Sequence, residues 1–145
     1  MRAVLILLVL LGCGPPQGAR PVTAAEADLL EAVEQEWVSR GLASIGEDCE
    51  EQARGLRVLV TSDVDVFTQL VFVGPEQALS AVRSYRVRMF DADPLVVIWH
   101  LADSRRGLAH EYTHVLEACT GHGVDRWHLD ERVWGPRQLS QEALR

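Results

Sequence analysis

Apolar residues recur at helical spacing near the start of this chain, in residues 24–40. Thr23 and Glu26 have the spacing of a capping box at the beginning of this segment, and Gly41 is a natural stop after it. The apolar positions that fall on one side of such a helix are Leu29, Leu30, Val33 and Trp37. The pattern predicts an amphipathic helix whose apolar side packs into a core.

A second helical pattern occupies residues 105–119. Asp103 and Ser104 are N-cap candidates before it, and Gly121 is a natural stop after it. An apolar stripe runs along the segment at spacings of three and four residues: Leu108, Tyr112, Val115, Leu116 and Cys119. We therefore expect a helix that buries this stripe.

Segments rich in β-branched and aromatic residues predict strands between these two helices. They are residues 56–61, 64–73, 85–90 and 95–101, with a loop and short helical turn at 42–55 and a short helix at 74–83. The run at Leu95–Trp99 is unbroken and apolar, which is typical of a buried strand. This order predicts a single α+β domain at residues 24–145, with a small mixed sheet packed on helices and a polar C-terminal stretch.

The charge balance is acidic, with 21 Asp and Glu against 14 Lys and Arg and a net charge of -7. Arg83, Arg86 and Arg88 form a small basic cluster, which is more typical of a solvated face than of a nucleic-acid site. We therefore expect an acidic surface and no nucleic-acid partner.

The N-terminus has the pattern of an export signal. A basic Met1–Arg2 pair precedes an apolar run at residues 3–11, which is too short to span a bilayer as a mature helix. Leu10-Leu11-Gly12-Cys13 then resembles the lipobox of bacterial lipoproteins. The resemblance implies a signal peptide at residues 1–12, a lipid on Cys13 and anchoring to a membrane of the bacterial cell envelope. An ordinary secretory signal is the alternative.

Residues 13–23 contain glycine, proline and glutamine and predict a flexible tether between the anchor and the domain. If Cys13 carries the lipid, Cys49 and Cys119 are the cysteines that remain. Export places both in an oxidising compartment, where a disulfide between them is one outcome and two free buried thiols are the other.

The second helical segment contains the sequence His110-Glu111-Tyr112-Thr113-His114, which is an H-E-x-x-H motif. On a helix, residues four apart lie on one face, so both imidazoles can reach the same ion. Zinc hydrolases use this arrangement, with the intervening glutamate close to the water that the metal activates. The motif therefore predicts a zinc site with Glu111 as general base.

A catalytic zinc needs a third protein ligand and an open position. We favour His128, because the stretch after Gly121 lets the chain leave the helix end and return alongside it. His122 is the alternate, although its nearness to the helix end favours a side chain that points away. The carboxylates of Glu131 and Glu142 are further candidates.

Several neighbours of the motif are expected to support the site or the core. Glu117 shares the helical face of the motif histidines, where it could orient a ligand, approach the metal or stay solvated. Asp125 and Asp130 are candidates to accept the second N–H of a ligand imidazole. Trp127 and Trp134 are expected to cover the core.

The motif, the preceding strand and the His128 segment resemble the zincin peptidases over about residues 95–135. The metzincin pattern fails, since Glu117 stands where that pattern has glycine. The match is better to SprT-like peptidases and related small bacterial zincins, which have a third histidine about a dozen residues after the motif.

This resemblance implies a membrane-anchored zinc peptidase of the cell envelope, with a protein, a peptide or a peptidoglycan cross-link as substrate. The small size leaves little chain for a second wall of the cleft, so an accessory protein could complete the site. The alternative is a non-catalytic envelope lipoprotein that uses a zincin-like fold as a binding or structural metal module.

Overall fold

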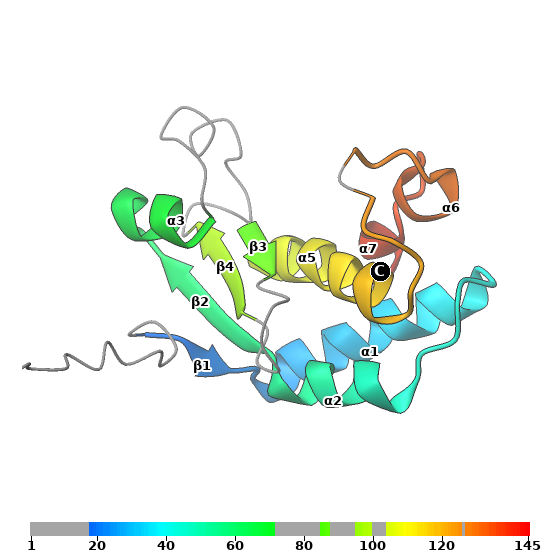
Figure 1. The fold of residues 1–145 in the computed structure, drawn as a ribbon, viewed down its shortest axis with the longest axis horizontal. Helices are drawn as coiled ribbons and strands as arrows, with labels where there is room; N and C mark the ends of the chain where they lie inside the picture. The colour runs from blue at the N-terminus through cyan, green and yellow to red at the C-terminus, as the bar shows by residue number, and fades with distance from the viewer. Residues whose placement is uncertain (1–17, 72–84, 88–94, 100–103, 126) are drawn as a thin grey trace, which may run out of the picture.

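A computed structural model describes residues 18–71, 85–87, 95–99, 104–125 and 127–145 of the chain. The elements in chain order are β1 (Arg20–Pro21), α1 (Ala24–Ser39), α2 (Glu47–Gly55), β2 (Arg57–Thr61), α3 (Val64–Val71), β3 (Tyr85–Val87), β4 (Leu95–Trp99), α5 (Ser104–Cys119), α6 (Glu131–Trp134) and α7 (Leu139–Glu142) (Figure 1). The fold is α+β, as expected from the order of helical and strand patterns.

The described strands form one mixed sheet in the order β1-β2-β4-β3 (Figure 1). β2 and β4 run parallel, whereas β1 and β3 pair antiparallel with them at the two edges. The central strand β4 buries the consecutive side chains of Val96, Val97 and Ile98. A strand that is covered on both faces has no polar side, which explains the unbroken apolar run in its sequence.

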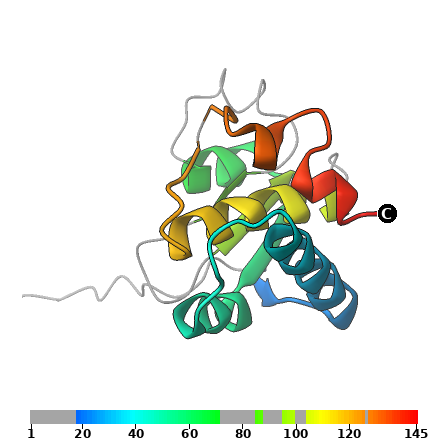
Figure 2. The ribbon, with the colours of Figure 1, turned by 90° about the vertical axis from the view of Figure 1, so that its right-hand side faces the viewer.

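Helix α5 lies at the centre of the fold, where it contacts β3 and β4 as well as α1, α2 and α7 (Figures 1 and 2). The predicted stripe is confirmed, because Leu108, Tyr112, Val115 and Leu116 are each at most 1% exposed and Cys119 is partly buried against the same core. Gly121 has a φ of 72°, in the left-handed region that ends a helix at little cost for glycine. The H-E-x-x-H motif thus lies on a helix that packs against both the sheet and other helices.

The predicted first helix is also confirmed. Thr23 is its N-cap and accepts a hydrogen bond from the Glu26 N–H, and the Glu26 carboxylate accepts one from the Thr23 N–H. Gly41 follows the helix with a φ of 64°. The expected apolar residues are all buried, in a core cluster that also contains residues of α5 and of the sheet: Leu29, Leu30, Val33 and Trp37.

The capping box gives the fold an acid-sensitive contact. The Arg20 guanidinium, 2.7 Å from Glu26, is the main cause that lowers the pKa of Glu26 from 4.5 to about 2. Because the folded pKa is lowered, this contact stabilises the fold above pH 4.5, and the stabilisation is lost as pH falls from 4.5 to 2. Its exposure to solvent limits the effect to about 1 kcal/mol. Urea denaturation of wild type and Glu26→Gln should differ by this amount at pH 6 and converge near pH 2.

The segment after β2 corrects a prediction. Residues 64–73 were expected to form a strand, but α3 is a helix from Val64 to Val71. Asp63 Oδ1 accepts the N–H groups of Asp65 and Val66 at 2.9 and 3.1 Å, as an N-cap side chain does. Phe67 is 1% exposed, and α3 contacts β2, β3 and β4. Capping and packing outweigh the β-propensity of the valines, which is a weak preference.

The N-terminal part of the described chain corrects a boundary. The expected tether included residues 20 and 21, but Arg20 and Pro21 pair with Val58 and Arg57 of β2. Some predictions lie outside the described residues: the signal peptide, the lipid on Cys13, the helix at 74–83 and the N-cap at Asp103. Among the helices of the described part, none has the length and apolar character to span a membrane.

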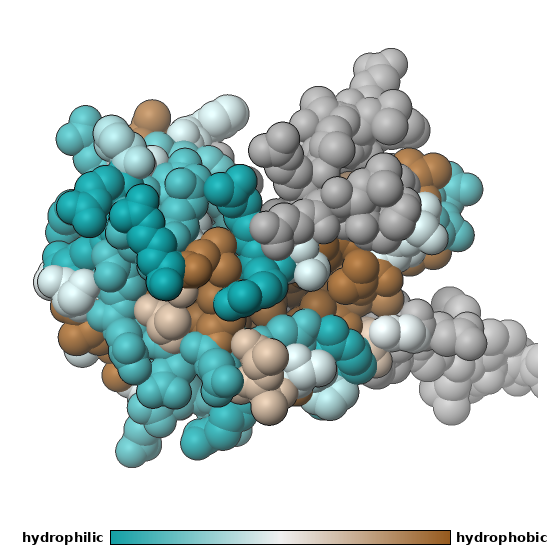
Figure 3. All heavy atoms as spheres, turned by 180° about the vertical axis from the view of Figure 1, so that it is seen from behind, coloured by the Kyte–Doolittle hydropathy of each residue, from teal (hydrophilic) through white to brown (hydrophobic). Residues whose placement is uncertain are grey.

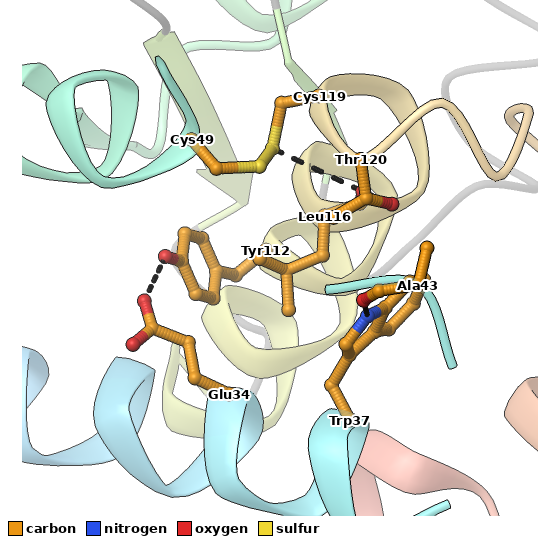
Figure 4. The surroundings of a disulfide bond; sticks show 8 residues. All are labelled: Glu34, Trp37, Ala43, Cys49, Tyr112, Leu116, Cys119 and Thr120. Carbon is orange, nitrogen blue, oxygen red and sulfur yellow. Dashed lines mark hydrogen bonds between the residues drawn. A yellow bond between two sulfur atoms is a disulfide. The ribbon is translucent and has the colours of Figure 1, made fainter. Parts of the chain in front are cut away.

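A disulfide joins Cys49 in α2 to Cys119 at the end of α5 (Figure 4). Their Cα atoms are 5.3 Å apart, within the usual range for a disulfide. Beside it, the Tyr112 hydroxyl donates to Glu34 of α1 at 2.5 Å, and Figure 4 shows both contacts on the side of α5 that faces α1 and α2. The disulfide and the Tyr112–Glu34 hydrogen bond therefore hold the motif helix from the same side.

The C-terminal stretch was expected to be polar, but it forms two short helices that complete the core. Val133 and Leu139 are fully buried and Trp134 is 5% exposed, and α7 packs against α1 and α5.

Seen from behind, hydrophilic side chains cover much of the described surface, and hydrophobic side chains gather near its centre (Figure 3). The expectation for Trp127 was wrong, because its side chain is 82% exposed.

Candidate metal centre

The structure brings His110 and His114 of α5 together with His128 of the following loop. One ligand atom from each of the three lies within 4.8 Å of the others, in the one metal-type cluster found among the described residues. The two α5 histidines meet because they are one helical turn apart, with ring centroids separated by 5.2 Å. His128 thus lies beside α5, as predicted from the sequence.

One pair of these nitrogens has the separation expected for a shared zinc ion. The Nε2 atoms of His114 and His128 are 3.2 Å apart. Two imidazole nitrogens that each bind a tetrahedral zinc at about 2.1 Å lie about 3.4 Å from each other. Three neutral imidazoles are also the donor set of a well-known class of catalytic zinc site.

The second nitrogen of His114 is engaged by Glu117. His114 Nδ1 lies 2.8 Å from Glu117 Oε2, and the Glu117 side chain has no exposure to solvent. The same carboxylate accepts the Trp134 indole N–H at 2.8 Å and the Asp125 backbone N–H at 3.1 Å. Since those two groups can only donate, Glu117 is an acceptor surrounded by donors, and it orients the Nδ1–H of His114 toward itself. Nε2 is then left as the lone-pair nitrogen that faces His128.

Trp134 covers one side of the three imidazoles. Its ring centroid is 4.8 Å from that of His110, 4.7 Å from that of His114 and 4.1 Å from that of His128. Its indole N–H also donates to Glu117. The Trp134 side chain thus packs against all three histidines and supports the carboxylate that contacts His114. Sequence reasoning placed Trp134 in the core but missed this role.

His128 is held in an unusual backbone conformation. Its φ is 56°, in the left-handed region, where a residue other than glycine costs about 1–2 kcal/mol. The surrounding loop is closed by Asp125, whose Oδ1 accepts the Trp127 N–H and whose Oδ2 accepts the N–H groups of Leu129 and Asp130. The Asp130 N–H contributes most to lowering the pKa of the Asp125 carboxyl, and Asp125 thus binds backbone rather than a ligand imidazole.

His122, the alternate third ligand, belongs to a different contact. Its Nε2 lies 2.9 Å from Asp130 Oδ2, and its ring meets Trp37 edge-on at 5.4 Å. The carboxylate candidates are also engaged elsewhere or turned outward, since Glu142 pairs with two arginines and Glu131 is exposed. Among the described residues, His128 is the candidate that joins the motif histidines.

Glu111 lies at the edge of the three histidines. It is 8% exposed, and its Oε1 lies 3.8 Å from Nε2 of His110. Its carboxylate therefore lies beside the cluster of three histidines and is not one of its ligand groups. Glu117 contacts the His114 ring, the Asp125 N–H and the Trp134 indole N–H.

The surroundings of His110 and His128 favour the neutral form of these two imidazoles. Burial, and then the neighbouring His114 and His128, lowers the pKa of His110 from 6.5 to about 3. Burial and His114 also lower the pKa of His128. A neutral imidazole has the lone pair that a metal needs, so neither residue has to release a proton at neutral pH before it binds an ion.

No protein-family model, curated protein or solved structure matches this chain at a significant level.

Proposed function

We propose that this chain is a zinc-dependent peptidase with a zincin-like active site. The observation that carries the proposal is the cluster of three histidines with Glu111 at its edge, 3.8 Å from His110. His110, His114 and His128 would hold the ion. Zinc in such a site supplies Lewis-acid activation of water and of a carbonyl group.

The protein's own groups then account for proton transfer. Glu111 accepts a proton from the attacking water and passes it to the leaving amine, which is the work of a general base followed by a general acid. Glu117 and Trp134 keep His114 in one orientation through their buried hydrogen bonds. The substrate class that fits this chemistry is a peptide, a protein or a peptide cross-link of the cell wall.

The exposure of His128 supports an open catalytic site. His122, the other histidine of this region, pairs with Asp130 and Trp37 instead of joining the cluster. His128 is exposed, so a water can reach the ion from its side. We further propose, from the lipobox-like sequence at Cys13, that the enzyme is anchored to a membrane of the bacterial cell envelope.

Hydrolysis that depends on zinc tests the proposal. The purified chain should cleave unfolded protein or a quenched fluorescent peptide mixture, lose this activity with a zinc chelator and regain it when zinc is restored. The Glu111→Gln variant, prepared in the same way, is the control for a contaminating protease. Zinc binding without hydrolysis of any peptide or cell-wall cross-link would instead support the non-catalytic metal module.

A further inference from the structure

The loop that carries His128 is organised by hydrogen bonds that converge on Asp125. The backbone N–H groups of Trp127, Leu129 and Asp130 all donate to its two carboxylate oxygens. The His128 N–H donates to the Asp125 carbonyl at 3.2 Å. Every described residue from 127 to 130 thus directs its N–H toward Asp125, and the His128 side chain is the part of the loop that turns toward α5.

This loop is tied directly to the second metal ligand. The Asp125 backbone N–H donates to Glu117 Oε2, the same oxygen that lies 2.8 Å from His114 Nδ1. One buried carboxylate therefore fixes the ring of His114 and also the starting point of the turn that presents His128. The two histidines whose Nε2 atoms lie 3.2 Å apart thus have a support in common.

We propose that Asp125 is a positioning residue that assembles the third metal ligand before any metal arrives. The inference rests on the proposed metal site but assigns a role to a residue that touches neither the ion nor the substrate. Left-handed backbone at His128 is unfavourable for a free loop, so the turn needs a local support. The three N–H groups that Asp125 binds provide this support. The His128 side chain is then preorganised, in place before zinc binds.

The Asp125→Asn variant should weaken zinc binding by roughly tenfold to a hundredfold, the range for residues that orient metal ligands. Both carboxylate oxygens accept N–H groups, and an amide has one oxygen, so in either orientation its NH₂ faces a backbone donor. Asp130→Asn is the matched control, because it removes the same charge from the same loop. Asp130 binds His122 and caps α6, and asparagine caps a helix as well as aspartate does.

A double-mutant cycle separates positioning from general destabilisation. Zinc affinity is measured by competition with a chromophoric chelator for wild type, Asp125→Asn, His128→Gly and the double variant. If Asp125 acts through His128, the loss caused by Asp125→Asn should disappear in the His128→Gly background. An equal loss in both backgrounds would overturn the proposal, as would wild-type affinity in Asp125→Asn.

Hydrogen exchange on the wild-type chain gives a second test that needs no variant. In the metal-free protein, the amides of Trp127, Leu129 and Asp130 should be protected, because the turn exists before the ion binds. Protection that appears only after zinc is added would show a recruited ligand and contradict the inference. Absence of zinc binding by the wild-type chain would overturn the metal site as well, whereas tight binding without hydrolysis would remove only the peptidase proposal.

Discussion

Replacing Glu111 with glutamine should lower the rate of peptide hydrolysis about a thousandfold, within the usual range for loss of a general base. The amide has nearly the same shape as the carboxylate but cannot take the proton of the attacking water. Zinc affinity should stay close to that of wild type, because Glu111 lies beside the three histidines and is not one of them. The measurement is kcat on a fluorescent peptide together with zinc content.

Glu131→Gln is the matched control for this substitution. It makes the same chemical change at an exposed position that the sequence alone offered as a carboxylate ligand. Full activity in Glu131→Gln and loss of activity in Glu111→Gln would show that the effect is specific to the proposed general base. Hydrolysis by Glu111→Gln at the wild-type rate would remove Glu111 from the mechanism.

Removal of the disulfide should produce the largest change in stability. The Cys49–Cys119 bond closes a loop of 70 residues, for which the loss of chain entropy in the unfolded state corresponds to about 4 kcal/mol. The Cys49→Ala/Cys119→Ala variant should therefore unfold at a much lower urea concentration than the oxidised wild type. Alanine is used because Cys49 is 2% exposed and a serine hydroxyl there would be buried.

Reducing agent provides the internal control for this experiment. It should shift the unfolding midpoint of wild type toward that of the double variant and leave the double variant unchanged. Equal stability of oxidised and reduced wild type would contradict a structural role for the disulfide.

The elements that sequence reasoning predicted well are those with local signals. The capping box at Thr23 and the apolar spacing of α1 and α5 specify helices through contacts within a few residues. The loop from Gly121 to His128 was long enough to favour His128 as third ligand, and the structure places it with the motif histidines.

The features that were missed depend on contacts between distant residues. α3 looked like a strand because valine has a high β-propensity, and the packing of α3 on the sheet outweighs that preference. Trp134 lies 17 residues after Glu117, and no spacing rule brings its indole N–H to a buried carboxylate. The pairing of Arg20 with Val58 likewise needs a partner that lies far along the chain.

The most direct test of the whole account is the zinc content of purified wild type, His128→Ala and His122→Ala. If His110, His114 and His128 form the site, wild type and His122→Ala should each retain one tightly bound zinc, and His128→Ala should lose it on dialysis. Loss of zinc from His122→Ala with retention by His128→Ala would contradict the assignment of the third ligand. Absence of bound metal in the wild-type chain would contradict the metal centre itself.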